Sequence, residues 1–206
     1  MLGAVLDGIQ PDMLPIIYFV RHGETDWNAE GRLQGQKDIP LNDLGQVQAA
    51  EVGAIIAHLA ANPLGLAYWS SPLTRTSETM SILRTVLGLP ASAFQVDDRL
   101  KELTFGRWEG FTWPDVEATW PGLAARRLAD KWNTAPPEGE SYAMLSERIM
   151  GFLPLIDRPS VVVSHGGVGR ALMAIIGGLP EDEAAASTVR QGVVYVFEGG
   201  RVRVAS

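Results

Sequence analysis

Two histidines in matching surroundings are the residues of this sequence best placed to do chemistry. His22 follows the strand-like run 15–20, and His165 follows the strand-like run 160–164; glycine comes directly after each of them. In open α/β sheets, ligand sites gather at the carboxyl ends of strands. We therefore expect both imidazoles to face one crevice, where a histidine can act as nucleophile, base or metal ligand.

Charged side chains that could assist these histidines lie at similar positions. Arg21 directly precedes His22, and Arg75 falls in the first turn of the helix expected after the strand-like run 66–70. Guanidinium groups suit phosphoryl or carboxylate oxygens, and the amino end of a helix also favours anions. Glu102, taken alone, is typical of a surface loop. Beside an anion pocket, its carboxyl group can donate a proton to a leaving oxygen.

Four motifs, taken in order, resemble the histidine phosphatase superfamily, the phosphoglycerate mutase-like group. They are Arg-His-Gly-Glu-Thr at 21–25, Ser-Pro-Leu-x-Arg-Thr-x-Glu-Thr at 71–79, Glu102 with Phe-Gly-x-Trp-Glu-Gly at 105–110, and Ser-His-Gly-Gly at 164–167. One short motif would be weak, but four in the family's order are specific. The resemblance covers the chain from about residue 15 to residue 177.

The resemblance implies a role for each of these residues. His22 would be the nucleophile and form a phosphohistidine; Arg21, Arg75 and His165 would hold the phosphoryl group. Glu102 would protonate the leaving oxygen and later activate water. The other residues implied to bind substrate or phosphate are Asn28, Gln34, Gly35 and Gly166. Phosphoryl transfer depends mainly on positioning and charge stabilisation, which two guanidinium groups and an imidazole can supply, so we expect no metal and no cofactor.

The resemblance leaves open whether the phosphoryl group passes to water or to a bound sugar acid. The sequence departs from the mutase pattern at three places and is also shorter. It has Gln34-Gly35 where mutases have threonine-glycine, and Gly166-Gly167 where mutases have glycine-asparagine. After Glu102 it continues with Leu103-Thr104-Phe105-Gly106, which differs from the continuation in mutases. These departures favour a phosphomonoester hydrolase of the small bacterial phosphatase branch, acting on a small phosphorylated metabolite. A cofactor-dependent phosphoglycerate mutase is the alternative.

The pair Arg126-Arg127 is the main indication against a phosphatase, because mutases use an arginine pair from the equivalent insertion to hold the substrate carboxylate. The surrounding sequence is typical of an exposed helix, which we favour. An arginine facing the pocket would instead favour substrates with a second anionic group. A non-catalytic relative that binds phosphorylated ligands and a metal enzyme using both histidines are weaker alternatives. The intact His22, Glu102 and His165 disfavour the first, and the lack of metal-ligand spacing disfavours the second.

Strand-like and helical segments alternate along the chain and predict an α/β fold. The strand-like runs are 15–20, 66–70, 94–97, 160–164, 193–197 and 201–205, and the helical segments are 44–61, 73–87, 141–153 and 168–176. This order favours a three-layer αβα sandwich with a mainly parallel central sheet. The last two runs flank Gly199-Gly200 and predict an antiparallel hairpin at one edge.

The segment 106–140 differs from the rest of the chain, because it holds four of the six tryptophans and several prolines. It is expected to be a small helical lid or pocket wall, or a satellite core, and these interpretations are compatible. We expect a single domain over residues 1–206. Residues 1–14 would be an N-terminal extension, of which residues 1–12 could be dispensable.

Composition narrows the classes of partner. The formal charge of −7 argues against a nucleic-acid-binding surface, so an anionic substrate needs a local basic pocket. No apolar run is long enough to span a bilayer, so no membrane partner is expected. The chain has no cysteine, which excludes disulfides and thiolate zinc sites and fits a cytoplasmic location. Either a monomer or a homodimer fits the sequence.

Overall fold

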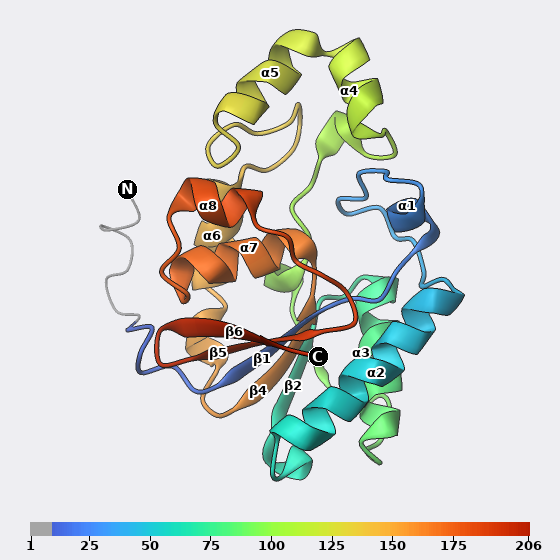
Figure 1. Cartoon of the computed structure of the whole chain (residues 1–206), viewed down its shortest axis with the longest axis vertical. Coiled ribbons are helices and arrows are strands. Elements are labelled where there is room, and N and C mark those ends of the chain that lie inside the picture. The colour runs from blue at the N-terminus through green and yellow to red at the C-terminus, as the bar shows by residue number, and fades with distance from the viewer. Residues whose placement is uncertain (1–9) are drawn as a thin grey trace.

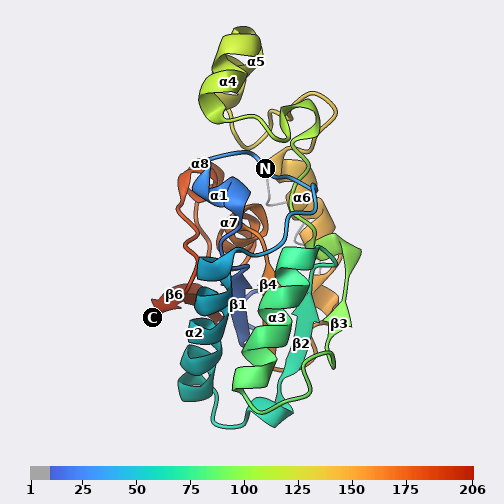
Figure 2. The same cartoon turned by 90° about the vertical axis from the view of Figure 1, so that its right-hand side faces the viewer.

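The computed structural model describes residues 10–206, in which a six-stranded sheet lies between two layers of helices (Figures 1 and 2). The strand order is β3-β2-β4-β1-β5-β6. The strands are β1 (Ile17–Arg21), β2 (Ala67–Ser70), β3 (Gln95–Val96), β4 (Ser160–Ser164), β5 (Val194–Glu198) and β6 (Arg201–Ala205). Strands β1 to β4 are parallel to one another. Strand β5 is antiparallel to β1, and β6 is antiparallel to β5, as the hairpin prediction requires. The predicted fold class is confirmed.

Helices cover both faces of this sheet: α2 (Asp43–Leu59) and α3 (Thr74–Val86) pack on one face, and α6 (Tyr142–Met150) and α7 (Gly166–Ile175) pack on the other. The other α-helices of the described residues are α1 (Asp26–Ala29), α4 (Trp113–Thr119), α5 (Pro121–Ala129) and α8 (Glu181–Ala186). The short helices α1 and α8 were not expected from the apolar spacing. The expectation that residues 1–12 are dispensable concerns a segment that lies mostly outside the described residues.

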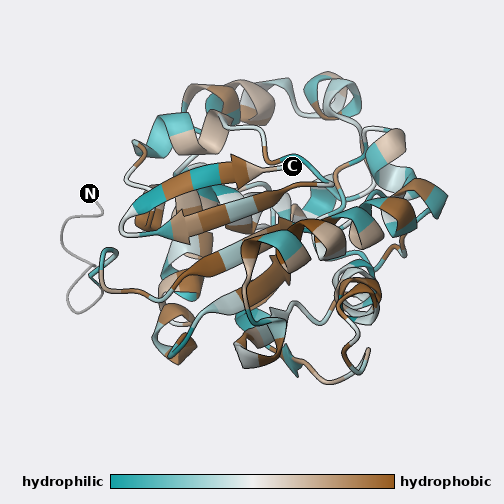
Figure 3. Ribbon diagram, turned by 60° about the horizontal axis from the view of Figure 1, so that its bottom comes forward, coloured by the Kyte–Doolittle hydropathy of each residue, from teal (hydrophilic) through white to brown (hydrophobic). Residues whose placement is uncertain are grey.

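Alternating side chains of the central strands divide the core into two parts. Tyr18 and Val20 of β1 pack with buried residues of α2 and α3, whereas Ile17 and Phe19 pack with α6 and α7. Successive side chains of a strand point to opposite faces, so an apolar run is buried on both sides only between two helical layers. Figure 3 shows brown, hydrophobic stretches along the central strands and mixed teal and brown colouring along the helices.

The segment 106–140 stands at one end of the molecule, where α4 and α5 project beyond the other helices (Figure 1). It contains a small core of its own, in which Trp108, Val116 and Ala124 are buried against partly buried neighbours that include Trp113 and Trp120. The satellite-core interpretation of the tryptophans therefore applies to these residues. Within the described residues, no helix is long and apolar enough to cross a membrane.

The sheet register brings three strand ends together. Arg21, the last residue of β1, lies opposite Ser164 of β4, and Ser70, the last residue of β2, lies opposite Val163. The next residue in each chain segment is therefore at the same edge of the sheet. These residues are His22, Ser71 and His165.

Candidate active site

His22 is buried, with 3% of its surface exposed, and its ring is held in a defined orientation. Its backbone N–H donates to the carbonyl oxygen of Ser164 at 2.9 Å. Its Nδ1 lies 2.7 Å from the carbonyl oxygen of Gly23, and because a carbonyl only accepts, Nδ1 must carry the proton. In the neutral ring, Nε2 then keeps its lone pair and is the nitrogen available for attack.

The surroundings of His22 keep its ring neutral. Burial lowers the pKa of His22 well below its ordinary value, and the positive charges of Arg75 and Arg21 lower it further. The repulsion from these two charges therefore contributes, but burial is the larger cause.

His165 is fully buried, and its Nε2 lies 2.9 Å from Oγ of Ser71. The two residues are 94 positions apart and meet because β2 and β4 are neighbours. Nδ1 of His165 is buried without a hydrogen-bond partner among the described residues. Burial, together with the charge of Arg75, also lowers the pKa of His165 well below its ordinary value.

The two arginines are anchored by backbone carbonyl groups. Nη1 of Arg21 donates to Val189 at 2.9 Å, while Nη1 and Nη2 of Arg75 donate to Lys37 at 2.7 Å and to Gly35 at 2.8 Å. Nε of both Arg21 and Arg75 is buried without a partner among the described residues. Burial lowers the pKa of Arg75 to about 10, so it remains a cation at neutral pH. Such fixed, unpartnered donors are preorganised for an anion.

Glu102 is held by the amino end of α7. Its Oε1 accepts from the N–H of Leu103 at 2.9 Å, and Oε2 accepts from the N–H of Gly167 at 3.0 Å. A Cβ atom at Gly167 would lie 2.3 Å from Oε1 of Glu102. Glycine at this position therefore leaves room for the carboxylate where it lies in this structure.

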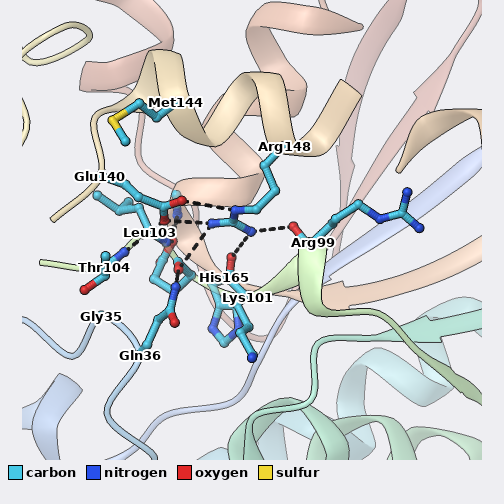
Figure 4. A network of polar contacts seen from close by, with 12 residues as sticks. Gly35, Gln36, Arg99, Lys101, Leu103, Thr104, Glu140, Met144, Arg148 and His165 are labelled. Carbon is cyan, nitrogen blue, oxygen red and sulfur yellow. Dashed lines mark hydrogen bonds and ion pairs between the residues drawn. The ribbon is translucent and has the colours of Figure 1, made fainter. Parts of the chain in front are cut away.

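A polar network holds the segment that carries Glu102 (Figure 4). Arg148 of α6 donates to the carbonyl oxygens of Arg99 at 2.5 Å and Lys101 at 2.9 Å, and it forms an ion pair with Glu140 at 2.9 Å. Glu140 in turn accepts from the N–H of Thr104 at 3.1 Å. Glu140 and Arg148 therefore hold the chain on both sides of Glu102.

A cavity of about 150 Å³ lies between these side chains. The predicted site residues that line it are Arg21, His22, Asn28, Gln34, Gly35, Arg75, Glu102 and Gly166. His165 is not among the lining residues; its ring packs against that of His22. Asn28 accepts hydrogen bonds at Oδ1 from the N–H of Thr25 at 3.2 Å and from Gln191 at 3.1 Å, which orients its amide.

Sequence reasoning missed several residues of this cavity, namely Arg32, Leu33, Phe105 and Arg170. Arg170 had a usable signal, because it follows Gly166 by four residues and so lies on the same face of α7. A Cβ atom at Gly23 would lie 2.1 Å from the carbonyl oxygen of Gly45, so the glycine after His22 allows α2 to approach the end of β1 closely.

The exposed-helix interpretation of the arginine pair is correct for Arg126 and wrong for Arg127. Arg126 is exposed, whereas Arg127 is only 2% exposed. Its Nη1 donates to the carbonyl oxygen of Thr134, because the chain after α5 turns back over this side chain. Within residues 10–206, no group of three or more His, Asp or Glu side chains is placed to hold a metal ion.

Comparison with known proteins agrees with this site. The family model of the histidine phosphatase superfamily (branch 1) matches residues 17–204. The chain belongs to this superfamily, which confirms the predicted resemblance. It is similar to a glucosyl-3-phosphoglycerate phosphatase from Mycolicibacterium vanbaalenii, with 38% identity over 81% of this chain and 76% of the relative.

Two further comparisons show how the family divides. A probable phosphoglycerate mutase from Salmonella arizonae is 37% identical over 80% of this chain and 75% of its own length. The solved structure of a mycobacterial glucosyl-3-phosphoglycerate phosphatase in complex with VO3 has a TM-score of 0.75 and 30% identity, over 93% of this chain and 97% of that chain. Phosphatases and mutase-like proteins are thus both among the relatives.

Proposed function

We propose that this protein is a metal-independent phosphomonoester hydrolase that acts on a small phosphorylated metabolite through a phosphohistidine at His22. One observation carries the proposal: His22, whose Nε2 is unprotonated, lines the same cavity as Arg21 and Arg75, whose Nε atoms are buried without a partner among the described residues. A nucleophile beside fixed cationic donors is the arrangement that phosphoryl transfer needs. The net charge of −7 disfavours a nucleic acid as the substrate.

In the first half-reaction, the lone pair of Nε2 of His22 forms a bond to phosphorus while the bond from phosphorus to the ester oxygen breaks. The two guanidinium groups stabilise the charge on the phosphoryl oxygens. If Ser71 donates its hydroxyl proton to Nε2 of His165, the neutral ring carries its proton on Nδ1, which is buried without a partner among the described residues and would add a donor at the edge of the cavity. Glu102, in its protonated form, gives its proton to the departing oxygen and becomes a carboxylate. An alcohol leaves, and the phosphoryl group stays on His22.

In the second half-reaction, the carboxylate of Glu102 takes a proton from water, and the water oxygen attacks phosphorus. The bond between phosphorus and Nε2 breaks, inorganic phosphate forms, and Glu102 is protonated for the next cycle. Asn28, Gln34 and Gly35 would bind the phosphoryl oxygens or the ester group. The Nδ1–H bond to Gly23 keeps the ring in the same tautomer throughout.

Hydrolysis is favoured over the mutase reaction by Gly167 in particular. The mutase pattern has asparagine at this position, and a side chain there would collide with Glu102 as it is placed here. The similarity to a phosphatase supports the same choice. The likeness to a phosphatase structure with bound VO3 supports a phosphoryl-sized oxyanion site.

The proposal is tested by measuring phosphate release from a panel of phosphomonoesters, alongside the isomerisation of 3-phosphoglycerate. We expect phosphate release to dominate, and His22→Ala to reduce it by about a thousandfold or more with the fold preserved. The matched control is His58→Ala, which removes the exposed third histidine on α2 and should leave turnover unchanged. Isomerisation without phosphate release would establish the mutase alternative, and full activity of His22→Ala would overturn the mechanism.

The covalent intermediate gives a second test. With p-nitrophenyl phosphate, whose leaving group needs no proton, Glu102→Gln slows the water step but not the first half-reaction. Phosphate attached to the protein should therefore accumulate and should be stable to alkali but labile to acid. Mass spectrometry should place it on His22. We also propose a cytoplasmic location, which the absence of cysteine supports and cell fractionation tests.

A further inference from the structure

Three side chains that line the catalytic cavity are bonded to one short loop. They are Arg21, Asn28 and Arg170, and the loop is the segment 187–191, which lies between α8 and β5. None of these five loop residues lines the cavity itself. The loop is therefore placed to hold side chains of the site without touching a bound substrate.

The two arginines donate to backbone carbonyl groups of this loop. Nη1 of Arg21 donates to Val189 at 2.9 Å, and Nε of Arg170 donates to Ser187 at 2.8 Å. Because the two carbonyl groups are only two residues apart, a shift of the loop would move both guanidinium groups. Phosphoryl transfer is sensitive to such a shift, since a misplacement of about 1 Å can lower a rate by about a hundredfold.

The third bond fixes which end of the Asn28 amide is free. Oδ1 of Asn28 lies 3.2 Å from the backbone nitrogen of Thr25, and a backbone N–H only donates, so the atom at this position is the oxygen. The group of Gln191 that lies 3.1 Å from the same oxygen is then its amide nitrogen, Nε2. These two donors leave Nδ2 of Asn28 as the donor available to a phosphoryl oxygen.

The loop is held in turn by the hydroxyl group of Tyr195 in β5. This oxygen accepts from the N–H of Arg190 at 2.7 Å and donates to the carbonyl oxygen of Thr188 at 3.3 Å, so it bonds on both sides of Val189. Tyr195 is 2% exposed, and its ring packs against Phe19 with the centroids 6.3 Å apart. A side chain fixed in the sheet therefore determines where the loop lies.

A second attachment keeps the loop folded if the hydroxyl is removed. The side chain of Val189 is 1% exposed and belongs to the same hydrophobic cluster as Phe19 and Tyr195. This apolar contact does not depend on the hydroxyl group. Loss of the hydroxyl should therefore change the exact position of the loop rather than its fold.

We propose that Tyr195 is a positioning residue for phosphoryl transfer. Its hydroxyl group fixes the loop 187–191, and the loop aligns Arg21 and Asn28 with the transferred phosphoryl group. The inference rests on the proposed function and deepens it, because it identifies what holds two of the phosphate-binding side chains. Gln191 has the corresponding role for Asn28 alone.

Tyr195→Phe tests the role of the hydroxyl, because it leaves the ring in place. We expect kcat/KM for p-nitrophenyl phosphate to fall by about tenfold, and the Kd for inorganic phosphate, measured by calorimetry, to rise by about as much. Tyr68→Phe is the matched control: the hydroxyl of Tyr68 donates to the carbonyl oxygen of Pro63 at 2.9 Å, and Tyr68 does not line the cavity. Urea unfolding should show similar losses of stability in both variants, but only Tyr195→Phe should lose activity.

A double-mutant cycle separates positioning from general damage. Gln191→Met removes the donor to Asn28 at similar side-chain size, and it should lower kcat/KM by about threefold or more. In Asn28→Ala protein, which lacks the amide that Gln191 orients, Gln191→Met should have no further effect. Gln95→Met, at an exposed glutamine of β3, is the control and should change nothing in either background. Additive effects of Gln191→Met and Asn28→Ala would contradict the alignment of Asn28 by the loop.

The Gln191 cycle also gives a result if Tyr195→Phe fails to fold, because Gln191 is only partly buried. If the wild type hydrolyses p-nitrophenyl phosphate but Tyr195→Phe equals it in turnover and in phosphate binding, or if Tyr68→Phe loses as much activity as Tyr195→Phe, the positioning role is wrong and the hydrolase proposal stands.

Failure of the proposed function gives a different result. If the wild type binds inorganic phosphate but releases none from p-nitrophenyl phosphate, the hydrolase proposal is wrong, and the effect of Tyr195→Phe on phosphate binding still decides the positioning role. A wild type that neither binds nor releases phosphate overturns both.

Discussion

The imidazole rings of His22 and His165 lie with their centroids 5.2 Å apart and their planes at 61°. Both rings are buried, and in both the pKa is lowered well below the ordinary value. Two adjacent imidazoles cannot both be charged at low cost, and two guanidinium groups beside them add to the repulsion. The neutral pair is therefore a property of the folded state.

This neutral pair predicts that the protein loses stability in mild acid. In the unfolded chain, each histidine titrates near pH 6.5, whereas in the folded chain it takes up its proton only at lower pH. Above about pH 6.5 the two histidines are unprotonated in both the folded and the unfolded chain. Below this pH they bind more protons in the unfolded chain, so the free energy of unfolding falls as the pH falls. The free energy of unfolding should then change by up to about 1.4 kcal/mol per pH unit for each histidine.

Urea unfolding between about pH 7.5 and pH 5.5 measures this slope, above the range where carboxylates titrate. The variant with His22→Gln and His165→Gln together should have a flatter pH profile. An equal slope in wild type and double variant would contradict the assignment of neutral buried rings.

Ser71 is expected to control catalysis through His165. Its Oγ lies 2.9 Å from Nε2 of His165, and removing it frees the ring to rotate or to change tautomer. We expect Ser71→Ala to lower kcat by about tenfold or more, with a smaller effect on KM. Steady-state kinetics, with near-UV circular dichroism to verify the fold, make the measurement.

Ser146→Ala is the matched control for this variant. Ser146 is also buried, on α6, but its hydroxyl has no partner among the described residues. Its removal should leave kcat unchanged. Equal kinetic effects of the two variants would show that Ser71 has no positioning role.

Gly167→Ala should displace Glu102, because the added Cβ would lie 2.3 Å from its carboxylate oxygen and 2.4 Å from Cδ2 of Leu103. Loss of a positioned proton donor should lower kcat about a hundredfold for alkyl phosphates. The loss should be smaller for p-nitrophenyl phosphate, whose leaving group needs no proton. This dependence on the leaving group separates lost acid catalysis from general damage.

Gly122→Ala provides the comparison for that variant. Gly122 lies in α5, and a Cβ atom there would meet nothing within 4 Å. The Gly122→Ala variant should be as active as the wild type on both alkyl phosphates and p-nitrophenyl phosphate. A Gly167→Ala protein with the same profile would mean that Glu102 needs no such close approach.

Arg148→Met is expected to lower the free energy of unfolding by about 2–3 kcal/mol. The ion pair of Arg148 with Glu140 is mostly buried, with side chains 20% and 18% exposed, and the same guanidinium bonds to the carbonyl oxygens of Arg99 and Lys101. Its removal leaves these acceptors without a donor.

Arg107→Met removes one partner of a different ion pair, the pair between Arg107 and Glu138. These two side chains are 63% and 67% exposed. Water replaces that contact, so we expect a change below about 1 kcal/mol. Urea unfolding of both variants makes the comparison. A smaller effect for Arg148→Met than for Arg107→Met would show that the network of Figure 4 does not stabilise the Glu102 segment.

The sheet and its main helices were predictable because their signals are local. Apolar runs bounded by glycine and proline predicted β1, β2, β4 and the final hairpin within one or two residues. The matched contexts of His22 and His165 then implied one site, since parallel strands end at a common edge. α1 and α8 were missed because helices of four and six residues carry too little periodicity.

Contacts between distant residues could not be predicted in this way. Ser71 and His165 are 94 residues apart, and Glu102 and Gly167 are 65 residues apart. The burial of Arg127 depends on the return of the chain to Thr134 and on the packing of Tyr142, neither of which its own helix encodes. A charged residue in a short polar helix therefore looked exposed.

The sequence by itself determined the superfamily, the sheet and the set of groups that could transfer a phosphoryl group. It could do so because strand-end motifs and apolar periodicity depend only on residues that are close together in the sequence. The tertiary structure decided which nitrogen of His22 is free, how Glu102 is held, and that the loop 187–191 bonds to both Arg21 and Asn28. These depend on burial and on hydrogen bonds across the fold, and they exist only once α6, α7 and this loop have packed around the strand ends.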